Sequence, residues 1–130
     1  MFVLDTNSLV YFFKGQGRVA ERLFATPPSE IGVSAIVLYE LEVGIAKSSA
    51  PKKRRKQLAE LVDLVNFLPF GELEARSAAT LRADLEKRGK PIGPLDTLIA
   101  GTAIANRAVL VTHNVREFGR APGLEAVDWY

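Results

Sequence analysis

Several common signals are missing from this 130-residue sequence. It contains no cysteine, which excludes a disulfide framework and a thiolate metal site. No apolar run approaches the ~20 residues that a membrane-spanning helix needs, and no basic region followed by a long apolar segment marks a signal peptide. The formal net charge of +2 is too small to indicate a nucleic-acid-binding protein by itself. We therefore expect a cytoplasmic protein without membrane association.

The residues that are present have the composition of a folded domain. Hydrophobic residues make up 48% of the chain and charged residues 25%, which are ordinary values for a globular protein. The chain is also long enough to bury a core without disulfides or a structural metal. We expect residues 1–130 to form one domain.

Short apolar runs alternate with longer amphipathic stretches along the chain. The patterns predict strands at residues 2–4, 30–33, 66–69, 108–112 and 125–128. They predict helices at 8–14, 18–25, 34–47, 52–64, 72–88 and 95–106. Ser34 suits a helix N-cap, whereas Pro51 and Pro94 suit a first helical turn. The alternation predicts an α/β fold of three α/β/α layers, with a central, mostly parallel sheet.

Asp5 directly follows the first predicted strand, without a spacer. A carboxylate beside a core strand loses hydration, which costs roughly several kcal/mol unless a cation or hydrogen bonds compensate. Ligands of parallel sheets collect outside the carboxyl ends of the strands, where Asp5 would lie. Two interpretations remain open: Asp5 binds a cation there, or Asp5 or Asn7 caps the helix that follows.

Glu40 lies in SAIVLYELEVGIA, residues 34–46, a predicted helix that is apolar nearly all round. Such a helix is expected to be largely buried, so a glutamate within it needs a partner. Glu42 is roughly 200° further round the helix and can point toward solvent. A metal ion or a buried arginine would each account for Glu40.

Asp96 stands in the first turn of the helix predicted at 95–106, where the helix dipole favours an acid. It also shares a helix face with Ile99, Ala100 and Ala103, the face expected to pack on the sheet. The small residues Ala100, Gly101 and Ala103 would let the helix approach the strands closely. Asp96 would then reach toward the strand ends.

Asn114 and Glu117 follow the fourth predicted strand within VLVTHNVREF, residues 109–118. Their spacing matches a capping box, although Ser or Thr is usual at its first position. Glu117 is also a candidate metal ligand, and Thr112 and Asn114 could orient a bound water. Both interpretations of this pair remain open.

The candidate site residues Asp5, Glu40, Asp96, Asn114 and Glu117 come from four separate elements near one end of the predicted sheet. Carboxylates that converge repel one another unless divalent cations lie between them. Oxygen ligands favour Mg²⁺, with Mn²⁺ as an alternative. Metal-assisted hydrolysis of a phosphodiester is the chemistry best suited to this arrangement.

Four ordered motifs carry a resemblance to a known family. LDTN at 4–7, the segment around Glu40, IGPLDTLIA at 92–100 and THNVREF at 112–118 resemble the PIN-domain ribonucleases. More narrowly, they resemble the VapC toxins of type II toxin–antitoxin systems. The resemblance covers essentially the whole chain. It implies a Mg²⁺-dependent endoribonuclease, an RNA substrate for which transfer RNA is a candidate, a VapB-like antitoxin and a homodimer.

The resemblance also assigns roles by position. It makes Asp5, Glu40 and Asp96 the core acidic residues and metal ligands. Asn114 stands where the family often has an aspartate. Two interpretations follow: Glu117 supplies the missing charge, or the site holds one tightly bound metal ion and recruits another with RNA. Hydrolysis by a metal-activated water needs no histidine as general base, so His113 is expected to pack in its loop or face solvent. The main alternative is a non-catalytic PIN-like module that binds RNA or protein.

The densest basic cluster is PKKRRKQ at 51–57. On the first turns of a helix these charges oppose the helix dipole, which favours an anionic partner. A solvated helix face is the simpler interpretation. The repeat of Leu58, Leu61, Val62 and Val65 predicts a core-facing side for the same helix.

Overall fold

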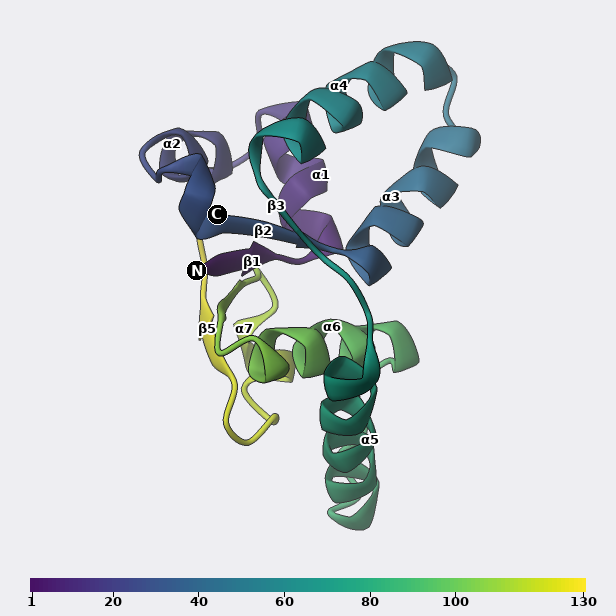
Figure 1. The fold of residues 1–130 in the computed structure, drawn as a ribbon, viewed down its shortest axis with the longest axis vertical. Coiled ribbons are helices and arrows are strands. Elements are labelled where there is room, and N and C mark those ends of the chain that lie inside the picture. The colour runs from purple at the N-terminus through teal and green to yellow at the C-terminus, as the bar shows by residue number, and fades with distance from the viewer.

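A five-stranded, all-parallel sheet forms the centre of the computed structural model, which describes residues 1–130. The strand order is β3-β2-β1-β4-β5 (Figure 1). The strands are β1 (Phe2–Leu4), β2 (Ile31–Ser34), β3 (Asn66–Leu68), β4 (Val109–Val111) and β5 (Glu125–Val127). Each predicted strand is present, with ends shifted by at most about one residue. The prediction of a three-layer α/β/α fold with a parallel sheet is confirmed.

The helices lie in two layers. They are α1 (Thr6–Lys14), α2 (Val19–Phe24), the short 3₁₀ helix η1 (Pro28–Glu30), α3 (Ala35–Ala46), α4 (Pro51–Leu64), α5 (Glu72–Lys87), α6 (Pro94–Ala105) and α7 (Val115–Phe118). Helices α1–α4 lie on one face of the sheet and α5–α7 on the other (Figure 1), as expected when parallel strands are joined by right-handed crossovers. The helix η1 was not predicted, and α7 was indicated only by its capping pattern.

Local signals fix several helix ends as predicted. Ser34 Oγ accepts a hydrogen bond from the Val37 N–H at 3.2 Å, and Pro51 and Pro94 are the first residues of α4 and α6. An Ala at the Ser34 N-cap would cost about 1 kcal/mol. These caps place the start of α3 directly at the carboxyl end of β2.

The core joins both helical layers to the sheet. Leu58 and Leu61 of α4 are buried, as their spacing predicted. Helices α5 and α6 pack closely at Gly101, where a Cβ would lie 2.6 Å from the Ala78 Cα. Trp129 is buried and its ring lies 5.2 Å from that of Phe2, which brings the two ends of the chain together (Figure 1).

Helix α3 corrects one expectation. The prediction that it is largely buried is wrong, because Tyr39 is 58% and Val43 38% exposed. Only Val37, Leu41 and Ile45 form its buried stripe. The sequence pattern does not distinguish the buried side of α3 from its exposed side, because both sides are apolar.

The strand order reverses direction at β1. Strands β2 and β3 lie on one side of it, and β4 and β5 lie on the other. Crevices at such switch points open at the carboxyl ends of the strands and collect ligands. The segments after β1 and β4 therefore meet at this edge. No helix in the structure is both long and apolar enough to span a membrane.

Candidate metal-binding active site

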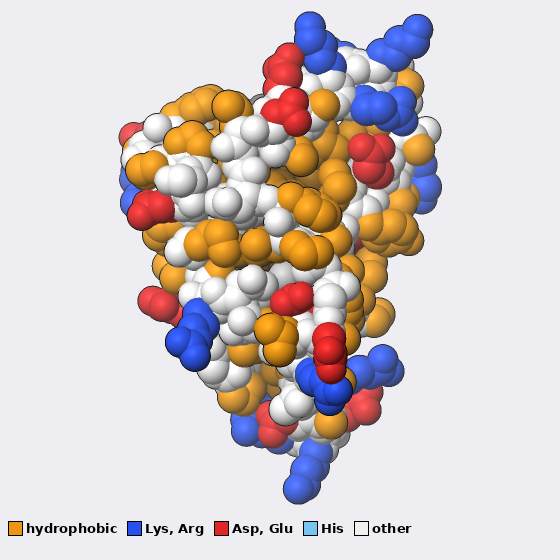
Figure 2. Space-filling model, in the orientation of Figure 1, with side chains coloured by type: hydrophobic (Ala, Val, Ile, Leu, Met, Phe, Trp, Pro, Cys, Tyr) orange, Lys and Arg blue, Asp and Glu red, His pale blue; other side chains and the backbone are white.

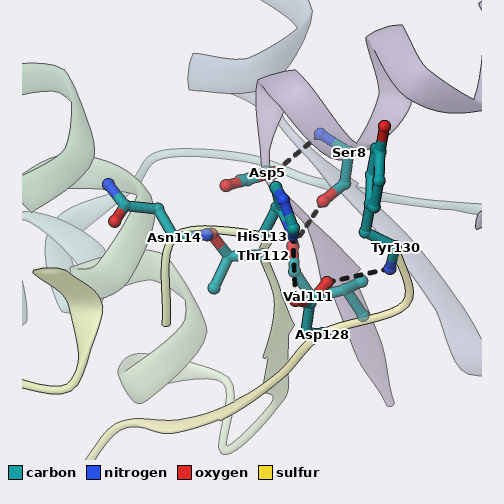
Figure 3. A network of polar contacts seen from close by, with 8 residues as sticks. All are labelled: Asp5, Ser8, Val111, Thr112, His113, Asn114, Asp128 and Tyr130. Atoms are coloured by element: carbon teal, nitrogen blue, oxygen red, sulfur yellow. Dashed lines mark hydrogen bonds and ion pairs between the residues drawn. The ribbon is translucent and has the colours of Figure 1, made fainter. Parts of the chain in front are cut away.

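Asp5 lies at the switch point and caps α1. Its Oδ1 accepts a hydrogen bond from the Ser8 N–H at 2.8 Å, and its own N–H donates to the Val111 carbonyl at 3.0 Å. The residue as a whole is 6% exposed. Its other carboxylate oxygen points away from Ser8, toward the side on which Asn114 lies (Figure 3). The capping interpretation is therefore confirmed, and one oxygen of Asp5 remains for a ligand.

Glu40 is held by a residue next to Asp5 in the chain. Thr6 Oγ1 donates a hydrogen bond to Glu40 Oε1 at 2.6 Å. No arginine forms a salt bridge with Glu40, so the alternative of a buried arginine partner is wrong. Glu42 points elsewhere, and its Oε2 lies 3.7 Å from Arg55 Nε. Thr6 was not predicted as a site residue, since nothing in LDTN indicates a bond to a helix 34 residues away.

Asp96 lies in the first turn of α6, above a fully buried helix face. Ile99, Ala100 and Ala103 on that face are at most 1% exposed, as predicted. Ala100 and Ala103 are small side chains that let α6 lie against the sheet, and Asp96 itself is partly withdrawn from water. The position of Asp96 at the helix start directs it toward the strand ends.

Asn114 and Glu117 interact, but not as a capping box. Asn114 Nδ2 donates to Glu117 Oε2, whereas no side chain caps the start of α7. The Asn114 N–H instead donates to Thr112 Oγ1 at 3.0 Å. Glu117 Oε1 accepts from the Gly93 N–H at 3.4 Å, which joins α7 to the start of α6. The capping-box prediction is wrong because an amide side chain can donate directly to the carboxylate.

The pKa of Asp96 shows that carboxylates from the other elements lie near it. Burial, followed by the negative charges of Glu117, Glu40 and Asp5, raises the pKa of Asp96 from 3.8 to about 6. Carboxylates from three other elements therefore act on Asp96 at the switch point. This is the convergence that the sequence predicted. Nothing basic among the causes of the shift offsets the accumulated negative charge.

The donor set fits a divalent cation. Four side chains supply carboxylate oxygens, the ligands that Mg²⁺ and Mn²⁺ prefer. They are Asp5, Glu40, Asp96 and Glu117. A cation among them would relieve the repulsion that, after burial, raises the pKa of Asp96. As the side chains are placed, no group of three or more Asp, Glu or His residues closes into a metal cluster. The assignment of Asp5, Glu40 and Asp96 as metal ligands therefore stays a prediction.

His113 belongs to a neighbouring network rather than to the acidic cluster. Its Nδ1 lies 2.9 Å from Asp128 Oδ2, and its ring stacks on that of Tyr130 with centroids 4.2 Å apart. Asp128 Oδ1 in turn accepts from the Tyr130 N–H (Figure 3). His113 packs in its loop, as expected. Tyr130 thus packs the C-terminal end of the chain against this loop.

Comparison with known proteins identifies the family. The profile of the PIN domain matches residues 2–124. The tRNA(fMet)-specific endonuclease VapC of Salmonella typhimurium is 34% identical over 98% of this chain and 97% of its own. Ribonuclease VapC2 of Rickettsia felis is also 34% identical, over 99% and 98% of the two chains.

Solved structures agree with the sequence comparison. The crystal structure of VapBC2 from Rickettsia felis, bound to a DNA fragment from its promoter, superposes with a TM-score of 0.92 at 34% identity. It covers 99% of this chain and 98% of that one. The fold, the acidic switch point and the relatives lead to one conclusion. The chain belongs to the PIN-domain family and, within it, to the VapC ribonucleases.

Proposed function

We propose that this protein is a divalent-metal-dependent endoribonuclease that acts as the toxin of a type II toxin–antitoxin pair. The observation that carries this proposal is the match of nearly the whole chain to the PIN domain and to VapC ribonucleases. The site agrees with it, because burial and then the charges of Glu117, Glu40 and Asp5 raise the pKa of Asp96. None of these four carboxylates forms a salt bridge, and such a group of oxygen ligands favours a divalent ion and, with it, phosphodiester hydrolysis. The whole chain, 1–130, would act as one PIN domain.

We propose Asp5, Glu40 and Asp96 as the metal ligands, with Mg²⁺ preferred over Mn²⁺. A bound divalent ion would lower the pKa of a coordinated water and stabilise the departing oxygen. Glu117 supplies the fourth negative charge, and Asn114 orients Glu117 through its amide. Thr6 fixes one oxygen of Glu40. His113 is bonded to Asp128 and has no assigned role in the chemistry.

The proposed substrate is transfer RNA, and the proposed partner is a VapB-like antitoxin. Support for the substrate is the likeness to the tRNA(fMet)-specific enzyme of Salmonella typhimurium over nearly the full length of both chains. Support for the partner is the likeness to the toxin of the VapBC2 assembly. We propose that the protein forms a homodimer, which sedimentation would test.

The decisive experiment incubates total RNA with the purified protein in Mg²⁺, in Mn²⁺, in EDTA, and with Asp96→Asn. We expect discrete products only with the wild type and a divalent ion, with 5′-phosphate and 3′-hydroxyl ends. Initiator and elongator transfer RNA would then be compared as purified substrates. Binding of RNA without any cleavage would favour a non-catalytic binding module instead.

A further inference from the structure

A groove of about 330 Å³ adjoins the acidic cluster on the α1–α4 side of the sheet. Glu40 and Thr6 form one wall of this groove. Lys14 from the end of α1, Ser48 after α3 and Arg54 from the first turns of α4 also line it. A molecule in the groove would therefore lie directly beside the proposed catalytic residues.

The two basic residues of this groove have no acidic partner. Arg55, Arg76, Arg82 and Arg88 each form an ion pair with an acid on a helix. Neither Lys14 nor Arg54 takes part in any of the salt bridges. Arg54 is partly buried, and its side chain donates one hydrogen bond, to Gln57 Oε1 at 3.5 Å. The guanidinium nitrogens of Arg54 that have no partner are open to solvent, so they can donate to an anion in the groove.

Only part of the basic segment 51–57 faces this groove. Lys and Arg side chains gather over the N-terminal part of α4, at the upper right of Figure 2. Lys52 and Lys53 are exposed and do not line the groove. The sequence offered the whole cluster as one candidate surface, whereas the fold selects Arg54 and joins it with Lys14 from another helix.

We propose that Lys14 and Arg54 bind a backbone phosphate of the RNA next to the bond that is cut. This inference rests on the proposed ribonuclease function and names a substrate contact of the same site. Phosphate is the anion that a guanidinium holds through paired hydrogen bonds, and the lysine adds a point charge. The groove lies beside Glu40, so a strand whose scissile phosphate sits at the acidic cluster can place a neighbouring phosphate between these two cations.

The test compares Lys14→Gln, Arg54→Gln and their double variant with Arg55→Gln. Arg55 is the matched control, because it lies on the same helix but is paired with Glu42 outside the groove. We expect the double variant to raise KM for RNA about tenfold or more, with a smaller effect on kcat. The slope of log affinity against log salt, measured by RNA binding to each variant in an Asp96→Asn background, should fall by about 1. The control should behave like its parent.

The outcomes separate this inference from the proposed function. If the wild type cuts RNA but the double variant keeps its KM and salt slope, the phosphate site is wrong and the nuclease assignment stands. If the double variant cuts RNA normally but loses affinity for an antitoxin, the groove is a protein-binding site and the inference is also overturned. A wild type that neither binds nor cuts RNA would overturn both. Melting temperatures show that the variants are folded.

Discussion

Thr6 holds Glu40 by a hydrogen bond of 2.6 Å that joins the first residue of α1 to the middle of α3. Asp5, the residue before Thr6, uses one oxygen to cap the same helix α1. The start of α1 thus fixes two carboxylates at once. A carboxylate held by a hydroxyl keeps its orientation at the cost of one of its lone pairs.

Thr6→Val is expected to reduce cleavage, and Thr6→Ser to restore it. A hydrogen bond to a charged group contributes about 1.5–3 kcal/mol. In the valine variant, water can replace part of the lost hydrogen bond to Glu40, so we expect a loss of about tenfold in kcat/KM. Steady-state cleavage of RNA measures it, with the melting temperature as a control for folding. A serine variant as poor as the valine variant would show that Thr6 acts only through packing.

Asp96→Asn should stabilise the metal-free protein in a pH-dependent way. The pKa of Asp96 is raised from 3.8 to about 6 on folding, so its ionised form opposes folding. This cost is absent below about pH 4, grows as the pH rises and is complete above about pH 6. In EDTA at pH 8 the variant should be more stable by about 1–2 kcal/mol, allowing for solvent screening.

Thermal unfolding of both proteins between pH 4 and pH 8 measures this difference. The two curves should meet near pH 4 and separate as the pH rises. A constant difference across this range would mean that the charge of Asp96 does not oppose folding.

Mg²⁺ should raise the melting temperature of the wild type. For a dissociation constant of about 1 mM, 10 mM Mg²⁺ adds about 1.4 kcal/mol to the free energy of unfolding. Glu40→Gln and Asp5→Asn remove proposed ligands and should reduce this gain. Scanning calorimetry with Mg²⁺ and then EDTA measures it, with Glu42→Gln as the matched control. A full Mg²⁺ response in the Glu40 and Asp5 variants would contradict their role as ligands.

Glu117→Gln should lower the pKa of Asp96 toward its ordinary value. The charge of Glu117 is the largest electrostatic cause of the shift after burial. Burial remains in the variant, so the pKa should fall only part of the way. NMR titration of the Asp96 carboxyl carbon measures the change. Asn114→Ala serves as the comparison, because it removes the amide donor but leaves the charge of Glu117 in place.

Gly101→Ala should destabilise the protein, whereas Gly44→Ala should not. A Cβ at Gly101 would lie 2.6 Å from backbone and side-chain atoms of Ala78, and such overpacking costs about 1–3 kcal/mol. A Cβ at Gly44 meets nothing within 4 Å, so alanine should add about 0.5–1 kcal/mol through helix propensity. Denaturant unfolding of the two variants measures both effects. Equal stabilities would mean that α5 and α6 separate at little cost.

Local sequence patterns determined the elements and the acidic candidates of this protein. The strands follow from short apolar runs, and the starts of α3, α4 and α6 follow from Ser34, Pro51 and Pro94. Each signal acts within one or two turns of chain, so it can be recognised without knowing the fold. Asp5 and Glu40 were conspicuous for the same reason, since each is a charge beside an apolar run.

The tertiary structure decided which of these residues interact. The bond between Thr6 and Glu40, and the groove shared by Lys14 and Arg54, join elements that are distant in sequence. The order of the strands brings those elements together, and helical periodicity does not encode that order. The donor capacity of the Asn114 amide likewise became visible only once Glu117 was placed beside it. The sequence by itself therefore determined the chemistry available at the site, and long-range packing decided its geometry.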